Sequence, residues 1–175
     1  MDIQNLENLD IAIEKEFEDI VQTARTVNDI FWDNRNTMLE VRSKGVTPLL
    51  GCRVDVRDAA IRISWFYWSF FKVRGQARRT NVHISKSKKS NSYSMSKLYA
   101  KALPNEVEMI EYCEQEFSKL RARSDSLRKL KQSYFYYKRS TLGDDLVFYE
   151  KSRKPSSGLQ SHEEEKGSGG FGENN

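Results

Sequence analysis

The sequence predicts an α+β fold: two long antiparallel helices in a coiled-coil-like helical hairpin, a small antiparallel β-hairpin or three-stranded sheet, and a disordered C-terminal tail. A heptad spacing of apolar residues near the N-terminus predicts a long helix, and strict alternation in the middle of the chain predicts a strand. Residues 1–20 carry a net charge of -6 and residues 119–139 a net charge of +7. An antiparallel pair of helices places these opposite charges side by side.

Residues 1–44 are expected to form the first helix. Apolar side chains recur there at alternating spacings of four and three, which is the pattern of a coiled-coil seam: Ile13, Phe17, Ile20, Ala24, Val27, Phe31, Met38 and Val41. Asn34 is the polar position of the seam, where a buried amide typically fixes the register. Gly45 and Pro48 end the helix. The same seam could pair two chains, so a homodimer remains open.

The middle of the chain changes to a period of two. From Ile61 to Val73, β-branched and aromatic residues alternate along a strand, and aromatic residues on both faces indicate cover on both sides of its middle. Residues 75–81 are expected to form a polar turn, and residues 82–84 the second strand of a hairpin. Residues 50–56 are a candidate third strand. Residues 86–92, KSKKSNS, are expected to form a basic loop.

A short helix is expected from Ser94, and the second long helix from about Pro104. Asn105 and Glu108 have the spacing of a capping box at its start. Its apolar stripe is expected to contain Ile110, Cys113, Phe117, Leu120, Leu127, Leu130, Tyr134 and Tyr137. Ser124 and Lys131 occupy polar positions along the same stripe. Residues 142–149 could form a brief extended segment. The domain prediction is a single α+β nucleic-acid-binding domain over residues 1–150 and a disordered, acidic, Gly/Ser-rich tail over residues 151–175.

Composition excludes several classes of protein. The longest mainly apolar run, residues 64–71, is far shorter than the roughly 20 residues that cross a bilayer, so we expect no membrane association. No secretory signal is expected at the N-terminus, and the default compartment is the cytosol. Two cysteines, Cys52 and Cys113, cannot build a disulfide framework, although pairing between them is conceivable.

The sequence predicts a protein that is not an enzyme, with no catalytic residue, cofactor or metal site. It has only two histidines, His83 and His162, and no phosphate-binding or dinucleotide-binding motif. Tyrosine is a nucleophile in DNA strand transfer, so Tyr134, Tyr136 and Tyr137 are candidates for that role. Because histidines for an accompanying metal are missing, packing or stacking is the preferred role for all three.

The formal net charge of +4 hides a strong segregation of charge. Residues 59–105 contain no Asp or Glu and carry +10, so the rest of the chain sums to -6. Charge asymmetry on this scale indicates a polyanion partner, because cations that neutralise phosphates release counterions. The candidate nucleic-acid-binding residues, three of them expected on the hairpin turn and the rest beyond it, are Arg74, Arg78, Arg79, Lys86, Lys88, Lys89, Lys97 and Lys101.

Three further features have alternative interpretations. Gln76 and Asn81 flank the arginine pair and could read base edges, or could be ordinary turn residues. The aromatic cluster of residues 65–71 could stack on bases, or could form the core on which the helices pack. The basic end of the second helix could contact nucleic acid or pair with the acidic start of the first.

The chain resembles the MobI-type auxiliary mobilisation proteins of integrative and conjugative elements. The similarity lies in IRISWFYWSFF at 61–71, KSKKSNSYSMSKLYAKA at 86–102 and PNEVEMIEYCEQEFSKLRAR at 104–123. The resemblance implies an accessory factor of DNA transfer that acts at the origin of transfer beside a separate relaxase. It carries over no functional residue.

Together these observations predict a non-enzymatic, cytoplasmic DNA-binding accessory factor. Its expected partners are duplex DNA, recognised with some sequence specificity, and a relaxase or another transfer protein. RNA is a distant alternative polymer, because a phosphate grip alone does not distinguish the two. The alternative from another class is a coiled-coil protein–protein interaction or regulatory module without direct nucleic-acid binding.

Overall fold

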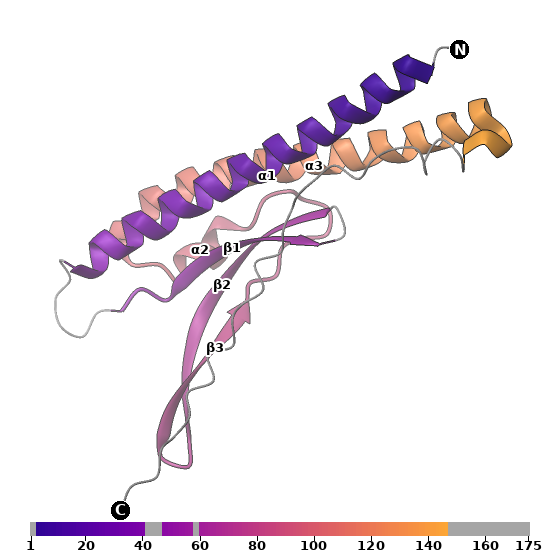
Figure 1. Cartoon of the computed structure of the whole chain (residues 1–175). Helices are drawn as coiled ribbons and strands as arrows, with labels where there is room; N and C mark the ends of the chain where they lie inside the picture. The colour runs from indigo at the N-terminus through magenta and orange to yellow at the C-terminus, as the bar shows by residue number, and fades with distance from the viewer. Residues whose placement is uncertain (1–2, 41–46, 58–59, 147–175) are drawn as a thin grey trace, which may run out of the picture. The chain divides into compact units, whose positions relative to one another are not determined.

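The computed structural model describes residues 3–40, 47–57 and 60–146, and it confirms the α+β fold class (Figure 1). In chain order the elements are α1 (Ile3–Glu40), β1 (Leu50–Arg57), β2 (Ala60–Val73), β3 (Gln76–His83), α2 (Met95–Tyr99), the 3-10 turn η1 (Pro104–Glu106), α3 (Val107–Leu142) and the 3-10 turn η2 (Gly143–Asp145). The chain divides into two units, residues 1–137 and 138–175. Of the described residues, the second unit holds the last turn of α3 and η2. The predicted tail, residues 151–175, lies outside the described residues.

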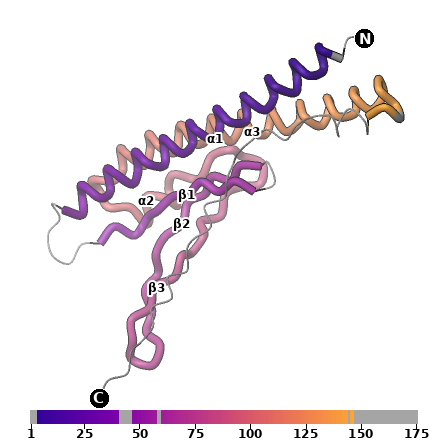
Figure 2. The backbone as a smooth tube through the Cα atoms, in the orientation of Figure 1, coloured from indigo at the N-terminus to yellow at the C-terminus, as the bar shows by residue number. Residues whose placement is uncertain are grey.

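Within the first unit, α1 and α3 run antiparallel, as predicted (Figure 2). Three contacts set their direction: Cys113 Sγ to the Val27 carbonyl at 4.0 Å, Arg123 to Glu16 and Asp19 at 2.8 and 2.9 Å, and the Tyr134 hydroxyl to the Leu6 carbonyl at 2.7 Å. Residue numbers rise along one helix as they fall along the other. The ion pairs of Arg123 confirm the predicted pairing between the acidic start of α1 and the basic part of α3.

The predicted seam of α1 is buried over most of its length and is filled within the chain. Its buried members are Ile13, Phe17, Ile20, Ala24, Val27 and Phe31. The prediction for Asn34 is wrong, because its neighbour Arg35 takes the buried position. Arg35 donates to the Pro48 carbonyl at 2.7 Å and lies 4.2 Å from the centre of the Trp68 ring. After Phe31 the buried face of α1 therefore contacts the sheet region through Arg35. Val41, the last predicted member of the seam, lies outside the described residues.

The stripe of α3 is also confirmed in its main positions. Ile110, Cys113, Phe117, Leu120, Leu127 and Tyr134 are buried. Leu130 and Tyr137 are exposed, so their assignment to the stripe is wrong. The buried residues Leu120, Leu127 and Tyr134 are spaced seven apart, and Leu130 does not share this spacing. Tyr137 lies after Tyr134, which contacts Leu6 near the start of α1.

The predicted cap at Asn105 is replaced by a different one. The Glu106 carboxylate accepts a hydrogen bond from the Leu103 backbone N–H at 2.8 Å, while the Glu106 N–H donates to the Leu103 carbonyl at 2.9 Å. This reciprocal pair satisfies backbone groups that the start of a helix otherwise leaves open. The cap residue is therefore Leu103, two residues before the predicted Asn105, and the η1 turn leads into α3.

The sheet has three antiparallel strands in the order β1-β2-β3, so the candidate third strand is confirmed. β1 pairs with the first half of β2, from Arg57 opposite Ala60 to Leu50 opposite Tyr67. β3 pairs with the second half, from His83 opposite Phe66 to Gln76 opposite Val73. Beyond β1, the strands β2 and β3 continue as a two-stranded ribbon that projects away from α1 and α3 (Figures 1 and 2). We call residues 69–80 the ribbon.

The predicted turn over residues 75–81 is wrong, since the chain reverses in two residues. Arg74 and Gly75 have φ of 50° and 81°, as a type I′ hairpin loop requires at both of its positions. This turn matches the twist of the flanking strands, so pairing resumes at Gln76. The polar residues that follow, which look like a loop in the sequence, form β3.

The expected cover on both sides of β2 is confirmed along its middle. Trp65 is fully buried between Phe31 of α1 and Phe117 of α3, at ring-centre distances of 5.2 and 5.9 Å. On the other face, Phe66 and Trp68 contact Trp32 of α1. The cover ends after Ser69, because every residue from 70 to 81 is exposed.

A buried carboxylate joins the sheet to α3. Glu114 accepts hydrogen bonds from the Trp65 indole N–H and the Tyr93 backbone N–H, both at 2.7 Å, and forms an ion pair with Arg121. Arg121 in turn donates to the Asn91 carbonyl. Both side chains of the ion pair are more than 90% buried. One carboxylate therefore fixes a strand, a loop and a helix.

Cys52 and Cys113 are free thiols, and both are buried. Burial raises the pKa of Cys113 to about 12 and raises the pKa of Cys52 well above its ordinary value. Both therefore remain protonated at neutral pH and are weak nucleophiles. None of the helices in the described residues is long and apolar enough to cross a membrane.

The Gly51→Ala substitution should destabilise the fold by about 1–3 kcal/mol. A Cβ at this position would lie 2.5 Å from the Phe66 ring, which is itself buried. Urea denaturation measures the loss. Adding Phe66→Leu to Gly51→Ala should recover part of it by opening space; a G51A protein as stable as the wild type contradicts the close packing of β1 on Phe66.

The Glu114→Ala substitution should cost about 3–5 kcal/mol, because it leaves the buried Arg121 charge without its carboxylate. The matched control is Glu116→Ala, at a position two residues after Glu114 on the same helix, which removes a carboxylate that pairs with the exposed Lys119. That control should cost less than about 1 kcal/mol. Equal losses in the two variants, measured by urea denaturation at pH 7, contradict the anchoring role of Glu114.

Candidate nucleic-acid interface

The ribbon brings together three of the predicted residues. Arg74 lies in the two-residue turn, while Arg78 and Arg79 lie in β3 and not on the turn, which corrects the prediction for these two. All three are exposed, as is Lys72 of β2. The ribbon contains no Asp or Glu. It therefore presents four cations without a neighbouring carboxylate in its own sequence.

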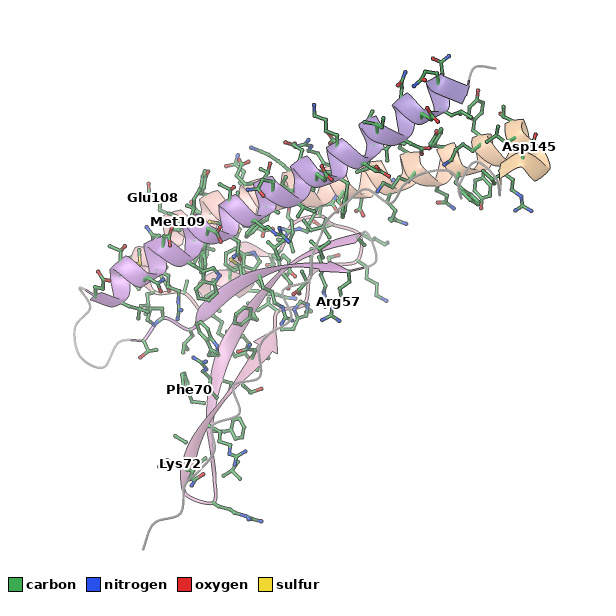
Figure 3. All side chains as sticks on the ribbon, in the orientation of Figure 1. Arg57, Phe70, Lys72, Glu108, Met109 and Asp145 are labelled. Carbon is green, nitrogen blue, oxygen red and sulfur yellow. The ribbon has the colours of Figure 1, made fainter. Side chains whose placement is uncertain are left out.

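The register determines which side chains share a face of the ribbon. Phe70 lies opposite Arg79, and Phe71 lies opposite Arg78. Successive residues of a strand point to opposite faces, so each face carries one phenyl ring beside one arginine. Figure 3 shows Phe70 and Lys72 on the ribbon, away from the helices. On the face of Phe70, the Arg79 guanidinium lies 5.2 Å from the centre of the Trp68 ring.

A second group of predicted residues lies on the loop after β3, on α2 and in the turn that follows α2. Lys97 donates to the Ser85 carbonyl at 3.2 Å and to its hydroxyl at 3.3 Å. Lys86 donates to the carbonyls of Ser90 and Ser87. These two ammonium groups already donate hydrogen bonds to oxygens of the loop, so they are less available to a ligand.

The remaining lysines of this group differ in their surroundings. Lys88 and Lys89 are exposed in a turn of the loop. Lys101 is half-buried, with its ammonium 4.5 Å from the centre of the Tyr67 ring. The structure thus divides the eight predicted residues into a ribbon group of three arginines and a loop group of five lysines.

A cationic cavity lies beside the loop group, and sequence reasoning missed it. Its volume is about 380 Å³, and it lies where the first residues of β2 face the loop and α3. Its charged and titratable lining residues are Arg62, His83, Lys86, Arg121 and Asp125. Burial first, and then the charges of Arg62 and Arg53, lower the pKa of His83. His83 is therefore neutral at physiological pH, and the positive charge of the cavity comes from Arg62 and Lys86, because the charge of Arg121 is paired with Glu114.

The tyrosines weighed as nucleophiles differ in their burial. The Tyr134 hydroxyl donates to the Leu6 carbonyl and its ring is buried, so its predicted packing role is confirmed. Tyr136 and Tyr137 are exposed, and the Tyr136 ring contacts Phe135 edge-on. Among the described residues, no group of three or more His, Cys, Asp or Glu side chains is placed to hold a metal ion.

The structure also divides the aromatic cluster for which two roles were open. Trp65 and Phe66 belong to the core, whereas Phe70 and Phe71 are 57% and 45% exposed. Gln76 is the first residue of β3 and Asn81 lies two residues before its end, so the turn interpretation is wrong for both. The signal for Lys72 was present in the sequence, because the alternation places it two residues after Phe70 on the same face.

Comparison with known proteins places the chain in a family. No curated protein and no solved structure matches it. The MobI protein family matches residues 20–134, a segment that includes most of α1, the whole sheet, α2 and α3 as far as Tyr134. The matched segment contains both the Glu114 ion pair and the ribbon. Because the match covers well over half of the chain, the protein belongs to the MobI family of mobilisation accessory proteins, as the resemblance in its sequence implied.

Proposed function

We propose that the protein is a non-enzymatic DNA-binding factor that acts at an origin of transfer, beside a separate relaxase, and that the ribbon binds duplex DNA. The observation that carries the proposal is the exposed ribbon, with Lys72 and three arginines and no acidic residue. Membership of the MobI family supports a role in mobilisation. The non-enzymatic part rests on the sequence, with its two histidines and no catalytic motif.

The dimensions of the ribbon suit a DNA groove. Two paired strands lie about 4.8 Å apart, and the major groove, about 12 Å wide, admits a two-stranded ribbon. From Ser69 to the turn the ribbon extends about 17 Å, at about 3.4 Å per residue. Arginines along both faces and at the turn can therefore reach phosphates on both sides of a groove. In this proposal two exposed amides contact base edges: Gln76 beside the turn and Asn81 at the base of the ribbon.

The loop group supplies a second contact in this proposal. Lys88 and Lys89 are exposed and lie in the same acid-free segment as the ribbon. Such lysines add sequence-independent affinity through counterion release. Specificity for one site then depends on the ribbon, and a relaxase or another transfer protein is the expected protein partner.

The double substitution Arg78→Ala and Arg79→Ala should weaken binding to duplex DNA several-fold. It should also lower the slope of log affinity against log salt by about 1.8, if each arginine contacts one phosphate. Fluorescence anisotropy from 50 to 200 mM salt measures both quantities. The matched control is Arg128→Ala, which removes an exposed arginine from α3. Unchanged affinity and slope in the ribbon variant, or an equal loss in the control, contradict the ribbon as the duplex interface.

The Arg74→Asn substitution should separate binding from stability. Arg74 has a positive φ, which costs a non-glycine residue about 1 kcal/mol and which asparagine tolerates well. The variant should therefore be as stable as the wild type or more stable in urea, yet bind duplex DNA more weakly. Arg74→Lys, which keeps the charge, should retain the affinity; equal affinities for all three proteins contradict a phosphate contact at the turn.

The role at the origin predicts selection of one locus. When the protein is mixed with fragments of its native genome at moderate salt, the retained DNA should be enriched in the fragment that carries the origin of transfer. Even recovery of all fragments contradicts site-specific action and leaves general polyanion binding.

A further inference from the structure

The exposed phenyl rings of the ribbon have no role in the core. Phe70 and Phe71 lie beyond the point where Trp32 and Arg35 cover β2, and both are surrounded in sequence by exposed residues. No other aromatic ring stacks on either of them within the described part of the chain. Because successive residues of a strand point to opposite faces, each face of the ribbon presents one phenyl ring that is available to a partner.

Each phenyl ring is paired with an arginine across the strands. Phe70 is opposite Arg79 and Phe71 is opposite Arg78, so their Cβ atoms lie about 4.5–5.5 Å apart. A flat apolar ring and an arginine on the same face match the two parts of a nucleotide, although the Arg79 guanidinium now lies against the Trp68 ring and has to turn toward a phosphate. The ring offers a face for the base, and the guanidinium offers two parallel N–H donors for the phosphate.

We propose that the ribbon binds single-stranded DNA, with unpaired bases stacked on Phe70 and Phe71 and the flanking phosphates held by Arg79 and Arg78. This inference rests on the proposed function and adds a second form of DNA that the ribbon binds besides the duplex. In an intact duplex the faces of the bases are covered by their neighbours, so the phenyl rings gain little there. An unpaired base can stack on a ring and contribute about 1–3 kcal/mol.

The position of the rings favours stacking over a wedge between base pairs. A wedge has to enter the duplex first, but the leading end of the ribbon is the turn of Arg74 and Gly75. The phenyl rings lie three and four residues behind it, on the two faces of the ribbon. Charge complementarity also selects the partner, because four cations and no carboxylate in the ribbon favour a polyanion over a second, equally basic ribbon.

The test uses the full chain with Phe70→Leu and Phe71→Leu, singly and together. Leucine keeps an apolar side chain but removes the flat ring, and both positions are exposed, so the fold should be unchanged in urea denaturation. Titration of a 12-nucleotide single strand carrying 2-aminopurine should show affinity about tenfold lower or more in the double variant. Affinity for the duplex of the same sequence should stay within about twofold. Phe135→Leu, an exposed aromatic on α3, is the matched control and should change neither value.

The outcomes separate this inference from the proposed function. Salt-dependent duplex binding together with single-strand binding that ignores both phenyl substitutions overturns the stacking inference alone. No binding to either form overturns both. A tighter complex with the RNA of the same sequence overturns the assignment to DNA. Sedimentation provides a final check: if the phenyl substitutions convert a dimer into a monomer and leave DNA binding unchanged, the rings belong to an interface between copies and the inference is wrong.

Discussion

The buried carboxylate of Glu114 is the constraint on which the arrangement of the sheet depends. A carboxylate and a guanidinium removed from water have to satisfy each other and their remaining hydrogen bonds. Glu114 does so with Arg121, the Trp65 indole and the Tyr93 backbone, which belong to α3, β2 and the loop before α2. Because all three must be in place at once, the network sets where β2 lies against the helices, with Trp65 held between Phe31 and Phe117.

The anchored strand carries the candidate interface at its other end. β2 runs unbroken for 14 residues, and its first half is paired with β1 and covered by helices. From Ser69 onward it is paired only with β3, and the two strands together form the ribbon. A continuous strand transmits its orientation directly, so the core determines the direction in which the ribbon projects (Figure 1). The helices are thus the support, and the acid-free ribbon is the candidate interface.

Local periodicity was sufficient to predict the elements and most of the core. The heptad positions from Ile13 to Phe31 are buried as expected, and the alternation over β2 correctly predicted a strand covered on both sides of its middle. The opposite charges of the two long helices also predicted their antiparallel pairing, which Arg123 confirms. These features are encoded by spacing or net charge within one segment.

Features that depend on contacts between distant segments were missed. Glu114 and Arg121 look like ordinary surface charges of a Glu-rich helix, and only the fold brings Trp65 to them across 49 positions. Arg35 is buried where Asn34 was expected, because its guanidinium donates to the Pro48 carbonyl and lies over the Trp68 ring. The turn was misplaced because Arg74 with a positive φ has no common sequence signature, and the polar β3 resembles a loop. The division of the aromatic cluster likewise depends on a distant contact, because the helices cover β2 only as far as Ser69 and leave Phe70 and Phe71 exposed.

Site-specific crosslinking tests the central claim, that the ribbon is the DNA interface, most directly. A photoreactive phenylalanine analogue at Val73 of the ribbon, and in a second protein at Leu130 of α3, occupies an exposed position in each case. On irradiation with DNA of the transfer origin, the account predicts a crosslink from position 73 that weakens as salt rises, and none from position 130. A crosslink from position 130 together with none from position 73 would contradict it.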